Sequence, residues 1–318
     1  MSRSFYRTRV AKLSGATLVA LTLALGSCGS REDQAPGAAA SARVPSSGFD
    51  DGPTSDILLA HDSGSLAVWL VNGDATTRQT IGSLQGGWSV LGMGDFDGDR
   101  HADLLMQDEH RNIGSWFMTG ATARGESVAP LPTGWGVAGI GDFDGDKKSD
   151  VLLQDRSGHL NIWFMNGAVP RSEPAGVIDS AAWTIEGVGD FDGDQKSDII
   201  MRNVSGSIGI WFMDGAVSRG ESAGEADSSW VLEGIGDFNA DGRSDLLWRN
   251  ASGETNLWLM DGVNPTLSRV GVVSTEYTIP QVGDFDGDGL DDFLVWNANG
   301  TLGAWTTVAS TPSSIPLG

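Results

Sequence analysis

The sequence has one cysteine, few basic residues and no apolar run long enough to cross a membrane. A single cysteine cannot form an intramolecular disulfide, so disulfide cross-links are excluded as a source of stability. The chain of 318 residues carries 20 Lys and Arg against 42 Asp and Glu, with a formal net charge of −22. Nucleic acid is therefore excluded as a partner, because phosphate binding requires clustered basic side chains.

Signatures of enzymes are also scarce. The chain contains no GxSxG, HExxH or P-loop motif. The four histidines fall in predicted turns or loops, and we expect the side chain of His101 to face solvent. With so many acidic residues, a pair of carboxylates of the glycosidase type stays open as an alternative.

Glycine is abundant, and the apolar content is that of a folded protein. The 45 glycines follow no collagen period and therefore indicate many tight turns. Hydrophobic residues make up 40% of the chain, which is enough to bury a large core. Intrinsic disorder of the bulk of the chain is excluded on this ground.

The N-terminal segment has the layout of a secretory signal. Arg3, Arg7, Arg9 and Lys12 precede a short apolar run over residues 13–25, and small residues follow it. This run is too short for a stable membrane span. We therefore predict export of the protein.

The residues Leu25-Gly26-Ser27-Cys28 resemble the lipobox of bacterial lipoproteins, in which the cysteine becomes the lipidated first residue of the mature chain. The alternative is an ordinary signal peptide that happens to contain a cysteine. The resemblance predicts a lipoprotein signal peptide over residues 1–27 and lipidation of Cys28. The stretch that follows is rich in Ala, Ser, Gly and Pro and predicts a flexible, lipid-anchored tether over residues 28–47, the end of which can add a strand to the first repeat unit. The mature protein would then be anchored to a bacterial membrane, at the outer membrane or cell surface, by its lipid alone.

A nine-residue acidic motif recurs along the rest of the chain. Its five copies are residues 95–103, 142–150, 190–198, 237–245 and 284–292, which start 47, 48, 47 and 47 residues apart. A sixth, decayed copy over residues 48–56 keeps Phe49, Asp50 and Asp56. Such regular spacing indicates one structural unit that has been copied.

Tryptophan follows the same period in two series. The first series is Trp69, Trp116, Trp163, Trp211, Trp258 and Trp305. The second is Trp88, Trp135, Trp183 and Trp230, with Tyr277 in the equivalent place. Since the first series has six members, we count six units, and we expect its rings to pack one unit against the next.

Each unit reads as four short strands separated by turns. In one unit, residues 230–236 lead into the acidic motif, residues 245–248 leave it, and residues 256–260 and 267–273 follow after Asx and Gly turns. Four strands in 40 to 50 residues are typical of a propeller blade. The sequence therefore predicts an all-β fold, a β-propeller of six four-stranded antiparallel blades over residues 48–318.

The acidic motif has the composition of a calcium site. Positions 1, 3, 5 and 9 carry carboxylates, and position 7 offers its backbone carbonyl. The predicted side-chain ligands are Asp95, Asp97, Asp99, Asp103, Asp142, Asp144, Asp146, Asp150, Asp190, Asp192, Asp194, Asp198, Asp237, Asn239, Asp241, Asp245, Asp284, Asp286, Asp288 and Asp292. The predicted carbonyl ligands are His101, Lys148, Lys196, Arg243 and Leu290. Ligation by oxygen alone favours Ca²⁺ over zinc or copper, so we expect about five structural Ca²⁺ ions rather than five solvated acidic turns.

The repeated Gly-Asp-Phe-Asp-Gly-Asp motif with a closing Asp resembles the FG-GAP/VCBS repeats of integrin α-chain propellers and of many secreted bacterial propellers. The resemblance covers residues 48–318 and implies Ca²⁺ at the motif residues, but no single activity. Two departures are the decayed copy over residues 48–56 and Asn239 in place of an aspartate. Because integrin-type propellers usually have seven blades, a seven-bladed ring stays as an alternative.

The turns predict which face is available to a ligand. In an up-and-down blade, the first and third turns lie on one face, so the acidic loops should share a face with the turns at Gly120, Gly167, Gly215 and Gly262. The other face would hold the hairpins and the variable connections, and we expect a glycan or protein ligand there. We predict a non-catalytic binding or adhesion module. The alternatives are a structural component of the cell envelope and an enzyme that acts on extracellular polysaccharide.

Overall fold

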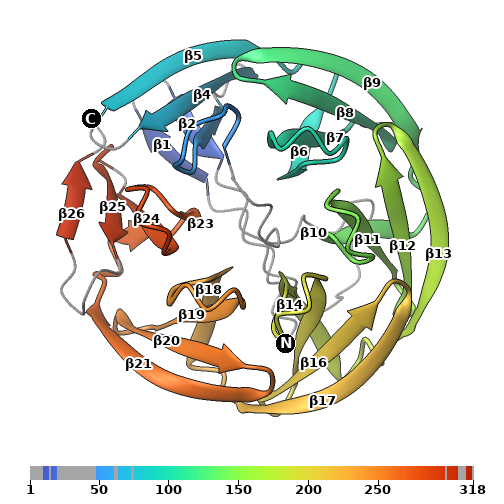
Figure 1. Cartoon of the computed structure of the whole chain (residues 1–318), viewed down its shortest axis with the longest axis vertical. Helices are drawn as coiled ribbons and strands as arrows, with labels where there is room; N and C mark the ends of the chain where they lie inside the picture. The colour runs from blue at the N-terminus through green and yellow to red at the C-terminus, as the bar shows by residue number, and fades with distance from the viewer. Residues whose placement is uncertain are drawn as a thin grey trace, which may run out of the picture.

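The computed structural model describes residues 10–13, 16–19, 48–60, 64–72, 75–297, 299–306 and 313–316. These residues form six antiparallel sheets arranged as blades around a central axis (Figure 1). The predicted all-β class and the six-bladed propeller are thus confirmed. No helix in the described part of the chain is long and apolar enough to cross a membrane. The predictions for Cys28 and for the tether over residues 28–47 lie outside the described residues.

Blades 2 to 5 share one strand order, from the axis outward. Blade 2 contains β6 (Ser89–Gly94), β7 (Asp103–Gln107), β8 (Asn112–Thr119) and β9 (Thr122–Pro130). Blade 3 contains β10 (Trp135–Gly141), β11 (Asp150–Asp155), β12 (His159–Asn166) and β13 (Val169–Val177). Blade 4 contains β14 (Trp183–Gly189), β15 (Asp198–Asn203), β16 (Ser207–Asp214) and β17 (Val217–Glu225). Blade 5 contains β18 (Trp230–Gly236), β19 (Asp245–Asn250), β20 (Glu254–Asp261) and β21 (Asn264–Val272).

Blade 1 differs at its inner edge. Its sheet consists of β3 (Ile57–Ala60), β4 (Ser65–Asn72) and β5 (Ala75–Ser83), and two further strands, β1 (Val10–Leu13) and β2 (Ala16–Val19), extend it. Strand β2 pairs with β3 through Thr17 and Ala60. Both added strands come from the segment predicted to be the signal peptide, so its removal would leave β3 as the inner strand of this blade.

Blade 6 has an interrupted inner strand. Its strands are β22 (Tyr277–Thr278), β23 (Val282–Gly283), β24 (Asp292–Asn297), β25 (Leu302–Thr306) and β26 (Ser313–Pro316). Both β22 and β23 pair with β24. Pro280 lies between them, and a proline cannot donate a ladder hydrogen bond, which accounts for the break.

Glycines on the inner strands allow neighbouring blades to approach closely. A Cβ atom on Gly141 would clash with the side chain of Ser197 in the next blade, and one on Gly139 would clash with Val188. In blade 3 the register shifts between Val137 and Gly139, and the inner strands of blades 2, 4 and 5 have the same irregularity. Part of the glycine excess is therefore explained by packing around the axis rather than by turns.

The apolar core lies mainly between blades. Leu105 and Phe117 of blade 2 belong to the same buried cluster as Val151 and Trp163 of blade 3. Similar clusters join the other neighbouring pairs within the described residues. The ring of Trp116 lies against Gly82 on β5 of the preceding blade, so the first tryptophan series packs blade against blade, as predicted.

Candidate metal sites

The acidic motifs form the first turn of each blade, between its inner strand and its second strand. In blade 2 the loop runs from Asp95, directly after β6, to Ala102, directly before β7. The backbone φ is 83° at Gly98, position 4, and 75° at Arg100, position 6. These two left-handed residues curl the chain, so that alternate side chains converge.

The aspartate at position 1 fixes this curled backbone. In blade 2, Asp95 Oδ1 accepts a hydrogen bond from Gly98 N at 2.6 Å, and its Oδ2 accepts one from Arg100 N at 2.8 Å. The first aspartates of blades 3, 4 and 6 accept the same pair of bonds. The role of position 1 is thus partly to satisfy backbone donors that the turn leaves unpaired.

The closing aspartate at position 9 joins the loop to the third strand. In blade 4, Asp198 Oδ2 accepts a hydrogen bond from Phe191 N and its Oδ1 accepts one from Met213 N, both at 2.9 Å. The same two bonds occur in blades 1, 2, 3 and 5. The closing carboxylates are almost completely buried. They are therefore structural residues in their own right.

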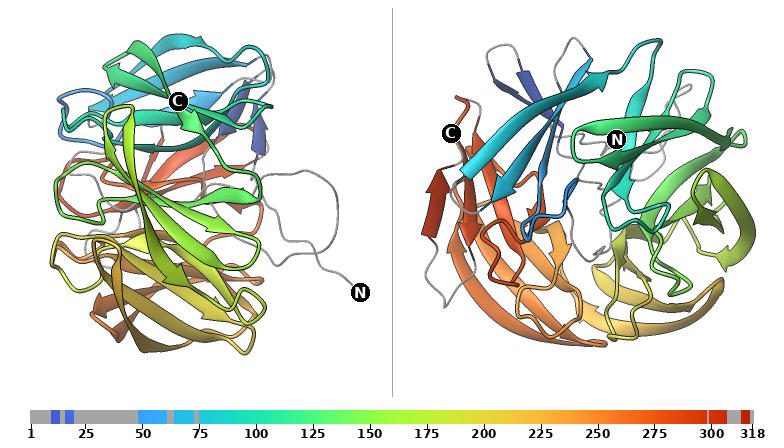
Figure 2. Two further views of the ribbon diagram at one scale, coloured as in Figure 1. Left: turned by 90° about the vertical axis from the view of Figure 1, so that its right-hand side faces the viewer. Right: turned by 45° about the horizontal axis from the view of Figure 1, so that its top comes forward.

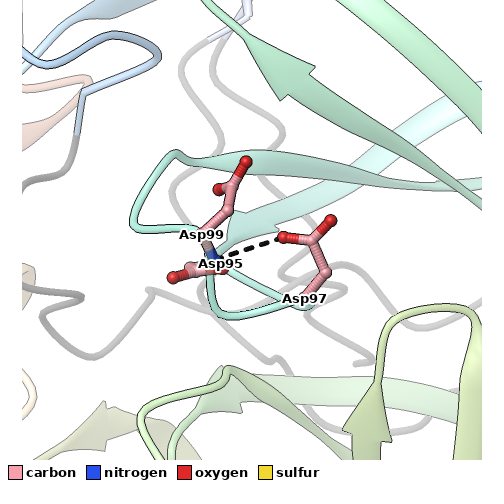
Figure 3. A group of neighbouring side chains, drawn as sticks. All are labelled: Asp95, Asp97 and Asp99. Atoms are coloured by element: carbon pink, nitrogen blue, oxygen red, sulfur yellow. Dashed lines mark hydrogen bonds between the residues drawn. The ribbon is translucent and has the colours of Figure 1, made fainter.

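The other acidic side chains form compact clusters. In blade 2, carboxylate oxygens of Asp95, Asp97 and Asp99 lie within 4.8 Å of one another (Figure 3). The matching clusters are Asp142, Asp144 and Asp146 in blade 3, and Asp190, Asp192 and Asp194 in blade 4. In blade 6 the three members are Asp284, Asp286 and Asp292, so there the closing aspartate takes part.

These carboxylates fit a hard divalent cation. Burial, together with the charges of Asp99 and Asp97, raises the pKa of Asp95, and burial with Asp99 raises that of Asp97. For the closing residues Asp103, Asp150 and Asp198, burial raises the pKa to about 8. All the donor atoms are oxygens, and the carboxylates of each cluster repel one another. Both properties suit Ca²⁺, whose positive charge would offset this repulsion.

Blade 5 has an altered loop. Asn239 Oδ1 accepts a hydrogen bond from Asp241 N at 3.0 Å, and its Nδ2 donates one to Asp241 Oδ2 at 3.1 Å. The amide thus takes the place of one carboxylate and still offers an oxygen. Its neighbour Ala240, with φ of 58°, occupies position 4, where the other acidic loops have glycine.

Blade 1 keeps the framework of the loop without the full acidic set. Asp56 accepts hydrogen bonds from Phe49 N at 2.6 Å and from Val71 N at 2.8 Å, as the other closing aspartates do. Glycine replaces the carboxylates at positions 1 and 5, Gly48 and Gly52. This loop therefore retains the two bonds of the closing aspartate but lacks those of position 1, the positive φ values at positions 4 and 6, and the grouped carboxylates.

Position 7 contributes more than a backbone carbonyl. His101 was expected to face solvent, but its side chain is only 12% exposed and lies 3.1 Å from Asp99 and 3.4 Å from Asp51 of blade 1. The solvent-facing expectation is therefore wrong. In blade 3, Lys148 Nζ contacts Asp146 at 2.6 Å, and its side chain covers Gly98 of the preceding loop. Position 7 carries a basic residue in four of the five motif copies. This pattern could have predicted the contacts with neighbouring acids, but it is visible only when the copies are aligned.

A ring of backbone hydrogen bonds links the six loops. The N–H at position 8 donates to the carbonyl at position 1 of the preceding blade. The bonds are Ala102 to Gly48, Ser149 to Asp95, Ser197 to Asp142, Ser244 to Asp190, Asp291 to Asp237 and Ser55 to Asp284, with lengths from 2.5 to 2.9 Å. The last of these closes the ring between blades 6 and 1. Gln281 supports the same seam, because its Nε2 donates to Asp56 O at 2.9 Å.

The third turns lie on the same face as the acidic loops. Gly120 N donates to Phe49 O at 2.6 Å, and Gly167 N donates to Phe96 O at 2.9 Å, so each third turn contacts the acidic loop of the preceding blade. Gly215 and Gly262 make the equivalent bonds. The predicted sharing of a face is confirmed, and the strands run from this face to the opposite one (Figure 2).

The hairpins of the opposite face are closed by Asx turns. Asn203 Oδ1 accepts hydrogen bonds from Ser205 N and Ser207 N, both at 2.9 Å. Asn250 accepts from Ser252 N and Glu254 N, both at 3.0 Å. Asn203 and Asn250 therefore each stabilise a hairpin turn of this face.

Two glutamates outside the acidic loops, the buried Glu233 and the mostly buried Glu186, are each paired with an arginine. Arg202 Nε lies 2.8 Å from Glu186 Oε1, and burial raises the pKa of this glutamate while Arg202 partly offsets the rise. Arg249 and Glu233 form the same pair in blade 5 at 2.8 Å. Arg202 Nη1 also donates to Trp230 O of the next blade at 2.7 Å. The sequence-based predictions missed these clamps between blades.

Comparison with protein families supports the repeat. Residues 142–201 and 237–295 match the family model of the FG-GAP-like repeat. The chain thus carries FG-GAP-like repeats within a six-bladed propeller. No curated protein sequence matches it significantly.

Solved propellers resemble the fold at low sequence identity. AofleA from Arthrobotrys oligospora is 11% identical with a TM-score of 0.54, covering 88% of this chain and 86% of its own. A triple arginine-to-alanine mutant of AofleA is 10% identical with a TM-score of 0.56, covering 88% and 87%. An oligogalacturonate lyase from Vibrio parahaemolyticus is 12% identical with a TM-score of 0.52, covering 87% and 78%. At these identities the likeness is one of fold alone.

Proposed function

We propose that this six-bladed propeller with FG-GAP-like repeats is a non-catalytic, calcium-stabilised binding module that recognises a glycan or protein at the cell surface. The observation that carries the proposal is the difference between its faces. One face is a hydrogen-bonded ring of six similar loops, five of which carry the full acidic motif. The opposite face is built from connections of unequal sequence, such as residues 84–88 and 226–229. Loops that repeat in every blade are suited to a structural role common to all blades. Connections that differ from blade to blade are suited to recognition of a specific ligand.

Calcium in this proposal has a structural role. The clustered carboxylates of blades 2, 3, 4 and 6 would hold four ions, and Asp237, Asn239 and Asp241 of blade 5 would hold a fifth. Bound Ca²⁺ supplies positive charge that offsets carboxylate repulsion and raises stability, since it is held by the folded state. The protein's own contribution is the backbone curl that positions 1 and 9 fix in advance.

The N-terminal residues complete the proposal. A lipid on Cys28 would hold the propeller at a bacterial membrane, and FG-GAP repeats are typical of extracellular proteins. Metabolic labelling with a palmitate analogue tests this anchor. We expect label on the wild-type chain and none on a Cys28→Ala variant; equal labelling of both would contradict it.

An enzymatic alternative can be tested directly, because one structural neighbour is an oligogalacturonate lyase. Glu186 and Glu233, the two little-exposed glutamates described above, are each held by an arginine. Neither is therefore available as an unpaired acid or base. We expect no release of unsaturated products from oligogalacturonate by the calcium-loaded protein, whereas measurable turnover would favour the enzyme.

A binding assay tests the main proposal. The calcium-loaded propeller, screened on a glycan array and used to capture envelope proteins, should retain a defined ligand. Substitutions on the opposite face, such as Asp179→Ala and Asp227→Ala, should reduce retention, because both lie in its connections. The matched control is Asp214→Ala, which lies at a third turn, on the face that carries the acidic loops. Absence of any ligand, or sensitivity to the control alone, would contradict the proposal.

A further inference from the structure

The seam between blades 1 and 2 contains a pocket of about 470 Å³ on the side of the opposite face. It is lined by Trp88, Trp116, Met106, Leu84 and residues of the strands β8 and β9. Its lining includes Asn112, at the start of β8, and the connection from Ser83 to Trp88. This size lies within the range of ligand pockets, roughly 300 to 1,000 Å³.

Glycine at two positions lets the indole rings of the pocket lie directly against the strands of blade 2. A Cβ on Gly114 would lie 3.2 Å from the Trp88 ring, and a Cβ on Gly125 would lie 3.3 Å from the Trp116 ring. In blade 3 the same positions carry Asn161 and Ser172, whose side chains hydrogen-bond each other at 2.7 Å. In blade 2 the indole rings thus lie directly over these two glycines, whereas in blade 3 the side chains of Asn161 and Ser172 occupy the equivalent places.

Glu126 is the one charged residue among those that line the pocket, and the other polar residues of the lining are uncharged. Asn112, Gly114 and Trp116 share one face of β8 because side chains alternate along a strand, and Ser127 shares a face of β9 with Gly125. Glu126 therefore points to the other face of β9, where it pairs with Arg124. The pocket thus combines two half-buried indole rings with amide and hydroxyl groups.

We propose that this pocket binds a neutral sugar ring, a proposal that rests on the binding function and names its ligand class. A pyranose has a flat face of C–H groups and an edge of hydroxyls. The electron-rich faces of Trp88 and Trp116 suit the polarised C–H groups. The amide of Gln85, the hydroxyl of Ser127 and the amide oxygen of Asn112, whose Nδ2 donates to Asp108, suit the edge. A charged ligand would find no counter-charge among these groups.

The seam between blades 3 and 4 repeats the arrangement. Gly209 lies under Trp183, with a Cβ position 3.1 Å from its ring, and Gly220 lies under Trp211, also at 3.1 Å. The seam between blades 4 and 5 instead carries Asn256 and Leu267 at these positions. Two seams with paired glycines would give two equivalent sugar sites, and multivalent glycans would then gain from avidity.

Saturation-transfer NMR tests the proposal with glucose, galactose, mannose, fucose and N-acetylglucosamine. The full calcium-loaded chain should bind at least one of them with roughly millimolar affinity. Sorbitol, an acyclic polyol with hydroxyls but no flat ring face, is the control ligand and should give no signal. Transfer to sorbitol equal to that of every sugar would overturn the proposal.

The matched variants copy blade 3 into the glycine-lined seams. Gly114→Asn with Gly125→Ser should remove one site, and adding Gly209→Asn with Gly220→Ser should weaken sugar binding at least about tenfold. An unchanged melting temperature in calcium would show that these variants fold. The single change Trp116→Phe, which removes one indole ring of the pocket, should weaken sugar binding by a smaller factor.

Sugar binding that survives all four substitutions, or no binding of any sugar by the wild-type chain, would overturn the pocket proposal. The binding function would still stand in that case if the array or the capture assay retained a ligand through the opposite face.

Discussion

The loop of blade 1 and the acidic loops of blades 2 to 6 share a framework but differ in charge. Asp56 and Asp198 accept equivalent pairs of backbone hydrogen bonds. Both kinds of loop also take part in the ring that links position 8 to position 1. Gly48 and Gly52, however, stand where the other loops have carboxylates. The closing aspartate and the ring of backbone bonds therefore anchor both kinds of loop, whereas the curled backbone and the ion site depend on the aspartate at position 1 and the remaining acids.

Removal of calcium should have the largest effect on the stability of the protein, because it affects all the acidic loops of blades 2 to 6. The loop of blade 1 should not be affected. Each occupied site contributes roughly 2.7 kcal/mol when free Ca²⁺ is one hundred times its dissociation constant. A chelator should therefore lower the free energy of unfolding by several kcal/mol, measured by thermal and denaturant unfolding. An unchanged midpoint would contradict a structural role for Ca²⁺.

Calorimetric titration can assign this effect to individual loops. Asp97→Ala should reduce the Ca²⁺ stoichiometry by one ion, because Asp97 belongs to the cluster of blade 2. Asp50→Ala, its counterpart at position 3 of blade 1, should leave the stoichiometry unchanged. Loss of an ion in both variants would show that blade 1 also holds Ca²⁺.

Substitution of a closing aspartate should have the next largest effect, and a similar one in both kinds of loop. Asp198→Ala and Asp56→Ala each leave two buried backbone N–H groups without an acceptor. The expected loss is about 3 kcal/mol for each variant, measured by denaturant unfolding in chelator. Asp→Asn at either position keeps one acceptor oxygen and should cost less. A neutral Asp56→Ala beside a destabilising Asp198→Ala would break the comparison.

The effect of pH should be smaller and should reverse with calcium. Burial raises the pKa of Asp150 to about 8 and that of Asp56 to about 6 in the folded chain. A raised carboxyl pKa gives stability that is present at low pH and is lost as pH rises through the folded value. In chelator, acidification from about pH 9 to about pH 5 should therefore raise the melting temperature.

With calcium bound, protons compete with the ion for the same carboxylates, so acidification should lower the melting temperature. Melting curves in the two buffers should thus have opposite slopes against pH. Parallel slopes would show that the acidic loops do not exchange protons for Ca²⁺. Asp150→Asn should flatten the slope in chelator, since the asparagine side chain does not titrate in this range.

The repeat period predicts the fold because every unit of the chain gives the same strands and turns. The series from Trp69 to Trp305 even predicts which surface packs between blades. Contacts between units were harder to predict, since a repeat does not show which neighbour a side chain reaches. His101 contacts Asp51 of blade 1, and Arg202 bonds the backbone of Trp230. The role of Gly114 and Gly125 is recognisable only by comparison with Asn161 and Ser172, which occupy the equivalent positions of the next blade.

The smallest expected effect comes from backbone strain, which distinguishes the acidic loops from one another. Blades 2, 3 and 4 carry one non-glycine residue with positive φ at position 6, namely Arg100, Lys147 and Gln195. Blade 5 carries Ala240 at position 4 instead, with φ of 58°, and glycine at position 6. Blade 6 has glycine at both positions, Gly287 and Gly289.

Ala240→Gly would give blade 5 the glycine pattern of blade 6 and should raise the free energy of unfolding by about 0.5–1 kcal/mol. The reverse change at the same position of another loop, Gly98→Ala, should lower it by a similar amount, since Gly98 has φ of 83°. Denaturant unfolding in chelator measures both without the ion's contribution. If Ala240→Gly had no effect while Gly98→Ala destabilised the protein, the loop of blade 5 would have relaxed around its alanine, and position 4 would not be equivalent across the loops.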